Sequence, residues 1–478
     1  MCIRFSLLAT EVDLLFKRAP QRADGQYVSM KHIKIALIVI LSVMTLGLCG
    51  ILVSGIMERN LFRESGRQQY NEVELVLERE IPVDGINDIS VLYNMNDNDI
   101  YLFESGTDTV IIKEYSSSEM DANELSAINV SEDSIEVKGA GRNIHEGFRF
   151  FFFNSYYYAR HYTEVYIPAS FSGELLLETA SGNIISDCDM NLEKSFTVAS
   201  ASGDVSFGSV TADNMSVSTS SGYIIMEKID TNVNGSIGEI SVETSSGDVN
   251  IKELTGVTRM ESSSGYVNAE KITGDTQIKT TSGDMDIKEI VGEVKTESSS
   301  GNVSIGNVTG NAKIRTTSGD ISIQHIEGGL QSVSSSGYVR VLEGNGDRSI
   351  STSSGDIILE VIEGNFQFST QSGEIQAAIQ KGEGSIETTS GNIRLELAEL
   401  IGVLDINSSS GSVSVQLSSD TEFGFLADTV SGSINTFFDS DPGIICMEDQ
   451  VQGTYGANGQ GNQVTIRTTS GDVSVSKQ

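Results

Sequence analysis

The sequence predicts an all-β chain, a single-chain parallel β-solenoid (β-helix) of 18-residue coils with two arms per coil, preceded by one transmembrane helix. Three observations predict it. A Ser-Gly-polar-aliphatic phrase returns at a fixed interval, apolar and polar residues alternate after each such glycine, and an uncharged apolar run lies near the N-terminus. The first two patterns indicate stacked β-coils, and the third indicates a membrane span.

The repeated phrase sets the length of the coil. The stretch from Lys279 to Gly301, KTTSGDMDIKEIVGEVKTESSSG, contains one full interval, and a second glycine series runs half an interval out of step, from Gly238 to Gly382. We expect glycine at the corners, where the backbone needs positive φ or where a side chain would crowd the bend. The first-series glycines are Gly247, Gly265, Gly283, Gly301, Gly319, Gly337, Gly355, Gly373 and Gly391.

The residues two and four positions after each first-series glycine are apolar in every repeat, from Val249 and Ile251 to Ile393 and Leu395. Such period-two alternation is typical of a strand with one buried face. The second arm shows the same pattern less regularly. A short strand cannot bury that face alone, so we predict coils stacked about 4.8 Å apart around one aliphatic column. A disordered Ser/Gly-rich chain would not keep these positions aliphatic.

The N-terminal part is predicted to cross a membrane. Residues 35–57 contain no charge and are long enough to span a bilayer as a helix. Residues 1–34, which carry basic side chains, would be cytoplasmic, and residues 58–72 would form a stalk, which places the solenoid outside the cell. A cleaved signal peptide and a lipoprotein signal ending at Cys49 are alternatives. Residues 1–29 are also open to interpretation as a mis-called start, with Met30 as the true one.

Residues 73–170 are predicted to form irregular first coils or a cap, and residues 171–478 the repeats, with a loop insertion at 433–463 and a C-terminal cap made by VTIRTTSGDVSVSK. The cap region contains an aromatic segment. It is either a plug for the end of the column or an exposed patch that contacts a membrane, a glycan or a partner protein. The candidate contact residues are Phe148, Phe150, Phe151, Phe152, Phe153, Tyr156, Tyr157, Tyr158 and Tyr162.

Charge and composition exclude several functions. The net charge of −35 disfavours nucleic acid, whose phosphates would be repelled. The four cysteines show no zinc-type spacing, and Cys188 and Cys446 would lie at opposite ends of the rod, too far apart for a disulfide. The acidic residues after the glycines form a regular ladder without a special cluster. We therefore expect no cofactor, no metal and no enzyme; a polysaccharide-acting β-helix enzyme and a calcium β-roll are the less favoured alternatives.

The phrases TSSGDV, TTSGDI and ADTVSGSI, preceded by IPASF at Ile167–Phe171, resemble the bacterial "putative adhesin" domain family of unknown function. The resemblance covers residues 75–478. It implies a β-solenoid on the outer side of a bacterial membrane, with a link to envelope-stress sensing in some members, and it supplies no site residues. We therefore expect a membrane-anchored, non-enzymatic binding, adhesin-like or sensing module, or alternatively a passive surface spacer. A protein or envelope component would be its partner, and its oligomeric state is open.

Overall fold

The computed structural model describes residues 73–94, 97–140, 149–150, 153–154, 161–186, 188–418, 420–456 and 461–478. Residues 72–478 form one compact unit, and the described residues contain strands and turns but no helix. The all-β prediction is therefore confirmed. The predicted helix at 35–57 and its flanks at 1–34 and 58–72 lie outside the described residues.

Within the described part of the chain, no helix is long and apolar enough to span a membrane.

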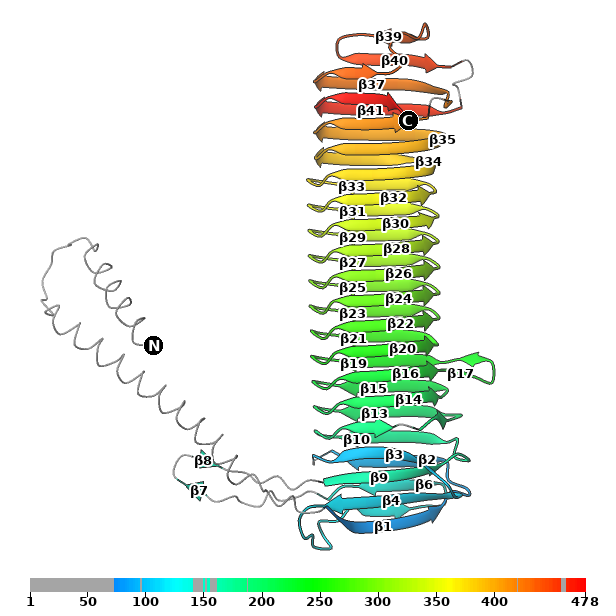
Figure 1. The fold of residues 1–478 in the computed structure, drawn as a ribbon, viewed down its shortest axis with the longest axis vertical. Helices are drawn as coiled ribbons and strands as arrows, with labels where there is room; N and C mark the ends of the chain where they lie inside the picture. The colour runs from blue at the N-terminus through cyan, green and yellow to red at the C-terminus, as the bar shows by residue number, and fades with distance from the viewer. Residues whose placement is uncertain are drawn as a thin grey trace, which may run out of the picture. The chain divides into compact units, whose positions relative to one another are not determined.

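The middle of the unit is a regular β-solenoid in which every coil contributes one strand to each of two parallel sheets (Figure 1). The register advances by one repeat per coil: Met285 pairs with Val303, which in turn pairs with Ile321. The predicted two-arm coil is thus confirmed. The first-arm strands are β16 (Ile224–Asp230), β20 (Val249–Thr255), β22 (Val267–Thr273), β24 (Met285–Val291), β26 (Val303–Thr309), β28 (Ile321–Glu327), β30 (Val339–Asn345) and β32 (Ile357–Glu363).

The second sheet is built from the shorter second arms. In the two longest strands, β34 (Ile375–Ser390) and β35 (Ile393–Ser410), both arms are continuous. The second-arm strands are β19 (Glu239–Thr244), β21 (Val257–Ser262), β23 (Thr276–Thr280), β25 (Val294–Ser298), β27 (Ala312–Thr316), β29 (Leu330–Ser334), β31 (Arg348–Thr352) and β33 (Phe366–Thr370).

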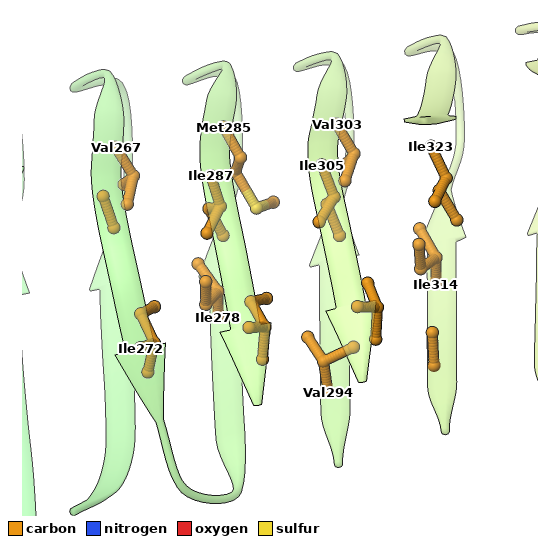
Figure 2. Close-up of a cluster of buried hydrophobic side chains, with 14 of the residues drawn as sticks. Val267, Ile272, Ile278, Met285, Ile287, Val294, Val303, Ile305, Ile314 and Ile323 are labelled. Atoms are coloured by element: carbon orange, nitrogen blue, oxygen red, sulfur yellow. The ribbon is translucent and has the colours of Figure 1, made fainter. Parts of the chain in front are cut away.

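The core is one aliphatic column between the two sheets (Figure 2). All eighteen inward positions predicted for the first arms are buried, and so are Thr296 and Ser332, which occupy the same inward column as Ile278 and Ile314. Most first arms also bury a third residue, such as Ile272, after two consecutive outward residues. Stacking therefore removes the apolar face of each strand from water, which is the main stabilising contribution to such a repeat.

The two glycine series are required for different reasons. A Cβ added to Gly319 would lie 2.0 Å from the carbonyl oxygen of Gly301 in the coil before, and the other first-series glycines are equally crowded. The second series is crowded too, and from Gly256 to Gly364 it also has positive φ, for example 140° at Gly310. A side chain would therefore push the coils apart at both corners, and at the second it would be strained as well.

Polar side chains hold the corners together. The hydroxyl of Ser262 accepts the N–H of Gly265 at 2.9 Å and donates to its carbonyl oxygen, and equivalent hydroxyls repeat along the stack. The acids that follow the glycines accept backbone N–H groups from the next coil, as Asp284 does from Asn302 at 2.7 Å. The aspartates of the acidic ladder are therefore structural, because their carboxylates satisfy backbone donors at exposed corners.

The N-terminal end of the stack, here called the base, is formed by residues 74–168. In the base the spatial order of the strands differs from their order in the sequence. The coil β2–β3 lies between β10–β11 on one side and β6 and β9 on the other, and β1, β4 and β5 add antiparallel pairs. The base and the first coils comprise β1 (Glu74–Pro82), β2 (Asp88–Tyr93), β3 (Asp99–Ser105), β4 (Thr109–Ser116), β5 (Ala127–Val130), β6 (Ser134–Lys138), β9 (His161–Pro168), β10 (Glu174–Thr179), β11 (Ile184–Ser186), β12 (Met190–Asn191), β13 (Ser195–Ser200), β14 (Val205–Thr211) and β15 (Asn214–Thr219). The strands β7 (Arg149–Phe150) and β8 (Phe153–Asn154) form a separate two-stranded sheet. A small hairpin, β17 (Asn232–Val233) and β18 (Ser236–Ile237), projects from the side of the stack (Figure 1).

At the other end of the stack, the tip, the last copy of the repeat does not lie where the sequence analysis predicted. The last repeat copy was expected to be the distal cap, but it forms β41 (Gln463–Ser470) and β42 (Val473–Lys477) inside the stack, between β35–β36 and β37–β38. The end itself is covered by an antiparallel hairpin, which pairs the otherwise open edge of β37. The remaining strands are β36 (Val413–Leu417), β37 (Phe423–Ser431), β38 (Ile434–Thr436), β39 (Ile444–Cys446) and β40 (Gln450–Tyr455).

Candidate functional site

A groove of 1230 Å³ runs along the outer side of the second arms, from β19 to β35. The repeat builds it, because each coil adds residues of the same three positions after the second-series glycine. The first position forms one wall, the second is the buried floor, and the third forms a ladder of outward side chains. A groove of this kind is therefore as long as the array of coils that forms it.

The wall column consists mostly of polar and acidic residues, and several of them accept a backbone N–H from the next coil. Asp275 accepts the N–H of Glu293 at 3.1 Å, Asn311 that of Gly329 at 2.9 Å, and Asp347 that of Asn365 at 3.3 Å. These three wall residues therefore contribute to coil stacking. The members of the wall column are Glu239, Val257, Asp275, Glu293, Asn311, Gly329, Asp347, Asn365 and Glu383.

The ladder column carries amide and basic side chains. Adjacent strands place its members side by side, so that Lys295 pairs in register with Lys313, and Lys313 with Gln331. Lys295 is bound to Glu297 at 2.9 Å, and this hydrogen bond lowers the pKa of Glu297. The members of the ladder column are Arg259, Gln277, Lys295, Lys313, Gln331, Ser349, Gln367 and Ser385.

The ladder column carries basic side chains, although the groove as a whole holds more acidic ones. Besides the buried Arg348, its lining includes three basic side chains and six carboxylates, those of Glu239, Asp275, Glu293, Asp347, Glu383 and Asp405. Within β21, β23, β25 and β27 themselves, the outward basic residues outnumber the outward acidic ones. A short β-solenoid segment can differ in charge from its surroundings because, at physiological salt, charges beyond about 8 Å are largely screened. The outward basic residues are Arg259, Lys279, Lys295, Lys313 and Arg315.

One floor residue is an arginine. Arg348 is 1% exposed and fills the space left by Gly344, where an added Cβ would lie 2.6 Å from Nη2. Its guanidinium donates to the carbonyl oxygens of Gly328 at 2.6 Å and Asn345 at 2.8 Å, and burial lowers its pKa to about 10. Arg348 therefore ties coils together from the inside, and it is too deeply buried to contact a ligand.

Most of the predicted aromatic contact patch lies outside the described residues. Phe148, Phe151, Phe152 and Tyr156–Tyr158 are not described, and only the backbone of Phe150 and Phe153 is. Tyr162 lies on β9, where it stacks on Tyr115 with ring centroids 4.6 Å apart and meets Tyr101 edge-on. It belongs to a half-buried aromatic cluster on the outer side of the base sheet.

The structure also shows what the cysteines and acidic residues do. Cys188 and Cys446 are free thiols, half-buried and exposed respectively, and burial raises the pKa of Cys188. Among the described residues, no group of three His, Cys, Asp or Glu side chains is arranged to hold a metal ion. The chemistry offered by this surface is therefore hydrogen bonding and charge, along a line, at the spacing of the coils.

The groove was not predicted from the sequence. The wall and ladder columns were predictable from the repeat, since outward residues at the same repeat position must lie side by side in adjacent coils. The clearest signal was the Gly328-Gly329 pair, where a second glycine replaces the expected polar wall residue. The depth of the groove could not be predicted from the sequence, because it depends on how the two sheets meet at the corner.

The sequence matches the family model described as Toastrack DUF4097 over residues 86–307, 234–381 and 347–476. These matches together cover most of the chain, so the protein belongs to this family, a domain of unknown function. The match agrees with the predicted resemblance as far as a repeat-bearing domain of unknown function. The adhesin role and the membrane anchor stay predictions.

No curated protein matches the sequence. A solved structure similar to this chain is the crystal structure of a "putative cell adhesion protein" from Clostridium sporogenes, with 9% sequence identity over 85% of this chain and 100% of that chain. Its TM-score is 0.16, so the likeness carries no argument about fold or function.

Proposed function

We propose that the protein is a non-catalytic binding module, anchored in a membrane by residues 35–57, that presents its solenoid outside the cell and recognises an envelope component along the groove. The groove itself is the observation that carries this proposal. It is continuous over many coils and presents amide, basic and acidic side chains at the spacing of the coils. An envelope-sensing role is the same binding event coupled to the anchor.

The arrangement of the carboxylates supports binding rather than catalysis. Hydrolytic β-helix enzymes need carboxylates that converge on one bond. Here Asp284, Asp320 and Asp356 each accept a backbone N–H from the next coil, and they are spaced along the stack. Their position therefore serves coil stacking, and the acidic ladder offers no converging pair.

The test compares two faces of the same rod. Full-length protein carrying Gln277→Trp, Gln331→Trp and Gln367→Trp fills the groove with large outward side chains. The matched control carries Asn250→Trp, Ser304→Trp and Ser322→Trp at outward positions of the first arms. We expect the groove variant to lose co-sedimentation with isolated cell-envelope material and the control to retain it. If wild type captures nothing, the passive-spacer alternative is correct. If both variants capture as wild type does, the groove is not the binding site.

The aromatic segment stays a second candidate contact. A deletion that tests it has to end before β9, because His161–Pro168 pairs with both β3 and β4 and is part of the base. Removal of residues 145–160 should weaken capture if these aromatic side chains touch the envelope. Unchanged capture by a folded deletion variant would contradict that role.

A further inference from the structure

The described residues contain two Asn-Gly dipeptides, Asn234-Gly235 and Asn345-Gly346, and the fold places them in opposite settings. An asparagine followed by glycine can modify itself, because the backbone nitrogen of the glycine can attack the side-chain amide carbon and no Cβ obstructs the approach. The reaction is fastest where that nitrogen is free of hydrogen bonds and the backbone around it can rotate. The two dipeptides differ in both respects.

Asn234 and Gly235 form the turn of the hairpin β17–β18, which projects from the side of the stack (Figure 1). The pairing of Val233 with Ser236 leaves these two residues between the strands. Both have positive φ, 52° at Asn234 and 81° at Gly235, as expected for the Asn-Gly turn of a tight hairpin. Among the described residues, Asn234 is the single non-glycine residue with positive φ.

This turn has no neighbouring coil to hold it. Both turn residues are exposed, and an added Cβ at Gly235 would have nothing within 4 Å. Within the described part of the chain, the N–H of Gly235 donates no backbone hydrogen bond. The hairpin is a two-stranded sheet of its own, and such a sheet is only marginally stable, so the turn can open while the rod stays folded.

The second dipeptide, Asn345-Gly346, is locked into the stack. The N–H of Gly346 donates to the carbonyl oxygen of Glu363, in the next coil, at 2.9 Å. The carbonyl oxygen of Asn345 accepts Nη2 of Arg348 at 2.8 Å, and a Cβ added to Gly346 would lie 2.7 Å from the carbonyl oxygen of Gly328. Attack by this nitrogen first has to break contacts between coils, so the fold protects the dipeptide.

We propose that Asn234 is a site of spontaneous deamidation in the folded protein. The nitrogen of Gly235 attacks Cγ of Asn234. The N–Cγ bond forms, the Cγ–Nδ2 bond breaks, and ammonia leaves with the proton of the attacking nitrogen, which gives a cyclic imide. Water then opens the ring at either carbonyl, so the product is aspartate or isoaspartate. The reaction needs only water, and the inference is independent of the function proposed for the groove.

The modification changes the charge and the shape of the hairpin. Each conversion adds one carboxylate to the turn, and Glu239, the first wall residue of the groove, follows β18 by two residues. Isoaspartate also lengthens the main chain by one methylene, which the register of a two-residue turn does not accommodate. We therefore expect the modified protein to keep its stacked coils and to lose the pairing of β17 with β18.

The test compares the two dipeptides within one chain. Purified full-length protein in mild detergent is incubated in mildly alkaline buffer, once folded and once in urea, and is then digested at acid pH so that digestion adds no deamidation. Peptide mass mapping measures the replacement of the amide by a carboxylate. In the folded protein we expect the Asn234 peptide to convert at least about tenfold faster than the Asn345 peptide. In urea the two rates should lie within about threefold of each other, because the fold no longer separates them.

Asn234→Gln is the control. Its longer side chain forms the corresponding ring far more slowly, so its peptide should not convert in the same time, and hydrogen exchange should show the coils unchanged. Absence of conversion at Asn234, equal rates at the two dipeptides in the folded protein, or faster conversion at Asn345 would overturn the proposal. A difference that persists unchanged in urea would overturn it as well, because the flanking sequence and not the hairpin would then set the rate.

Discussion

The middle coils and the two ends of the rod bury different kinds of side chain. In the middle, each coil adds the same few aliphatic residues, such as Ile323, to one column. At the base, Tyr93, Asn98, Glu114 and Thr163 are buried, and the Tyr93 hydroxyl lies 2.9 Å from Ser126 and 2.7 Å from Thr163.

At the tip an aromatic cluster closes the column: Phe425 and Phe438 meet at 5.0 Å, and Phe423 packs edge-on against Phe438 at 5.5 Å. The difference shows that repetition settles how coils stack, whereas each end needs its own arrangement. An end coil has a neighbour on one side only, so the exposed end of the column has to be covered by side chains that the repeat does not contain.

The largest effect is expected in the middle. Ile323→Asp places an unpaired carboxylate in the aliphatic column and should lower the free energy of unfolding by about 4 kcal/mol or more. Gln324→Asp, one residue on and exposed, should change it by less than about 0.5 kcal/mol. Chemical denaturation followed by circular dichroism measures both. Equal effects at the two positions would contradict the assignment of inward and outward residues.

The next effect tests the tip. Phe423→Ala removes a fully buried ring from the aromatic cluster and should cost about 3–5 kcal/mol. Val430→Ala, at an 81% exposed side chain on the same strand, serves as the control and should be nearly silent. Hydrogen exchange should show the loss of protection in β37–β42, with the middle coils unchanged. Loss of protection spread evenly along the rod would mean that the tip is not a separate cover.

A smaller effect is expected at the base. Tyr93→Phe keeps the ring but removes the hydroxyl shared by Ser126 and Thr163, which leaves buried polar groups with fewer partners, at about 1–3 kcal/mol. Tyr223→Phe, at a side chain 52% exposed, should leave the midpoint of thermal unfolding where it is. If Tyr93→Phe is as silent as Tyr223→Phe, the polar network does not contribute to the stability of the base.

The smallest effect concerns pH. Asp472, in the inserted coil, accepts the N–H and the hydroxyl of Ser433, both at 2.8 Å, and these bonds lower its pKa. Because the folded-state pKa lies below the unfolded-state pKa, the stabilisation is present at neutral pH and is lost as pH falls through the folded-state value. Asp472→Asn should therefore flatten the acid side of a melting-temperature profile. Glu387→Gln is the control. An equal change in that variant would show that the loss of stability in acid does not come from Asp472.

The sequence was enough to predict the regular part of the fold, because the repeat position alone decides which residues point inward, as for Val303 and Ile305. The third inward residue, such as Ile272, escaped notice because two outward residues before it break the alternation. The strand order at the ends could not be predicted. The repeat phrase at residues 463–477 reads like any other copy, and only tertiary pairing shows that it is inserted between earlier strands.

Only part of the candidate site could be predicted from the sequence. The adjacency of Lys295 and Lys313 follows from the repeat length, because residues one repeat apart lie side by side. The open space at Gly329 does not follow, since the sequence shows the Gly328-Gly329 pair but not which of the two glycines leaves room for a side chain. The aromatic segment at residues 148–162, predicted to be either a plug or a contact patch, lies mostly outside the described residues. The aromatic cluster at the tip, which includes Phe423, Phe438 and Tyr455, was not predicted.

The insertion of β41 and β42 between earlier strands has a consequence for biosynthesis. A growing solenoid can add coils in the order in which the ribosome delivers them, but here the coil of β37 and β38 has no finished surface to settle on until residues 463–477 have been made. The strands at the tip can therefore settle into place only after residues 463–477 have been synthesised.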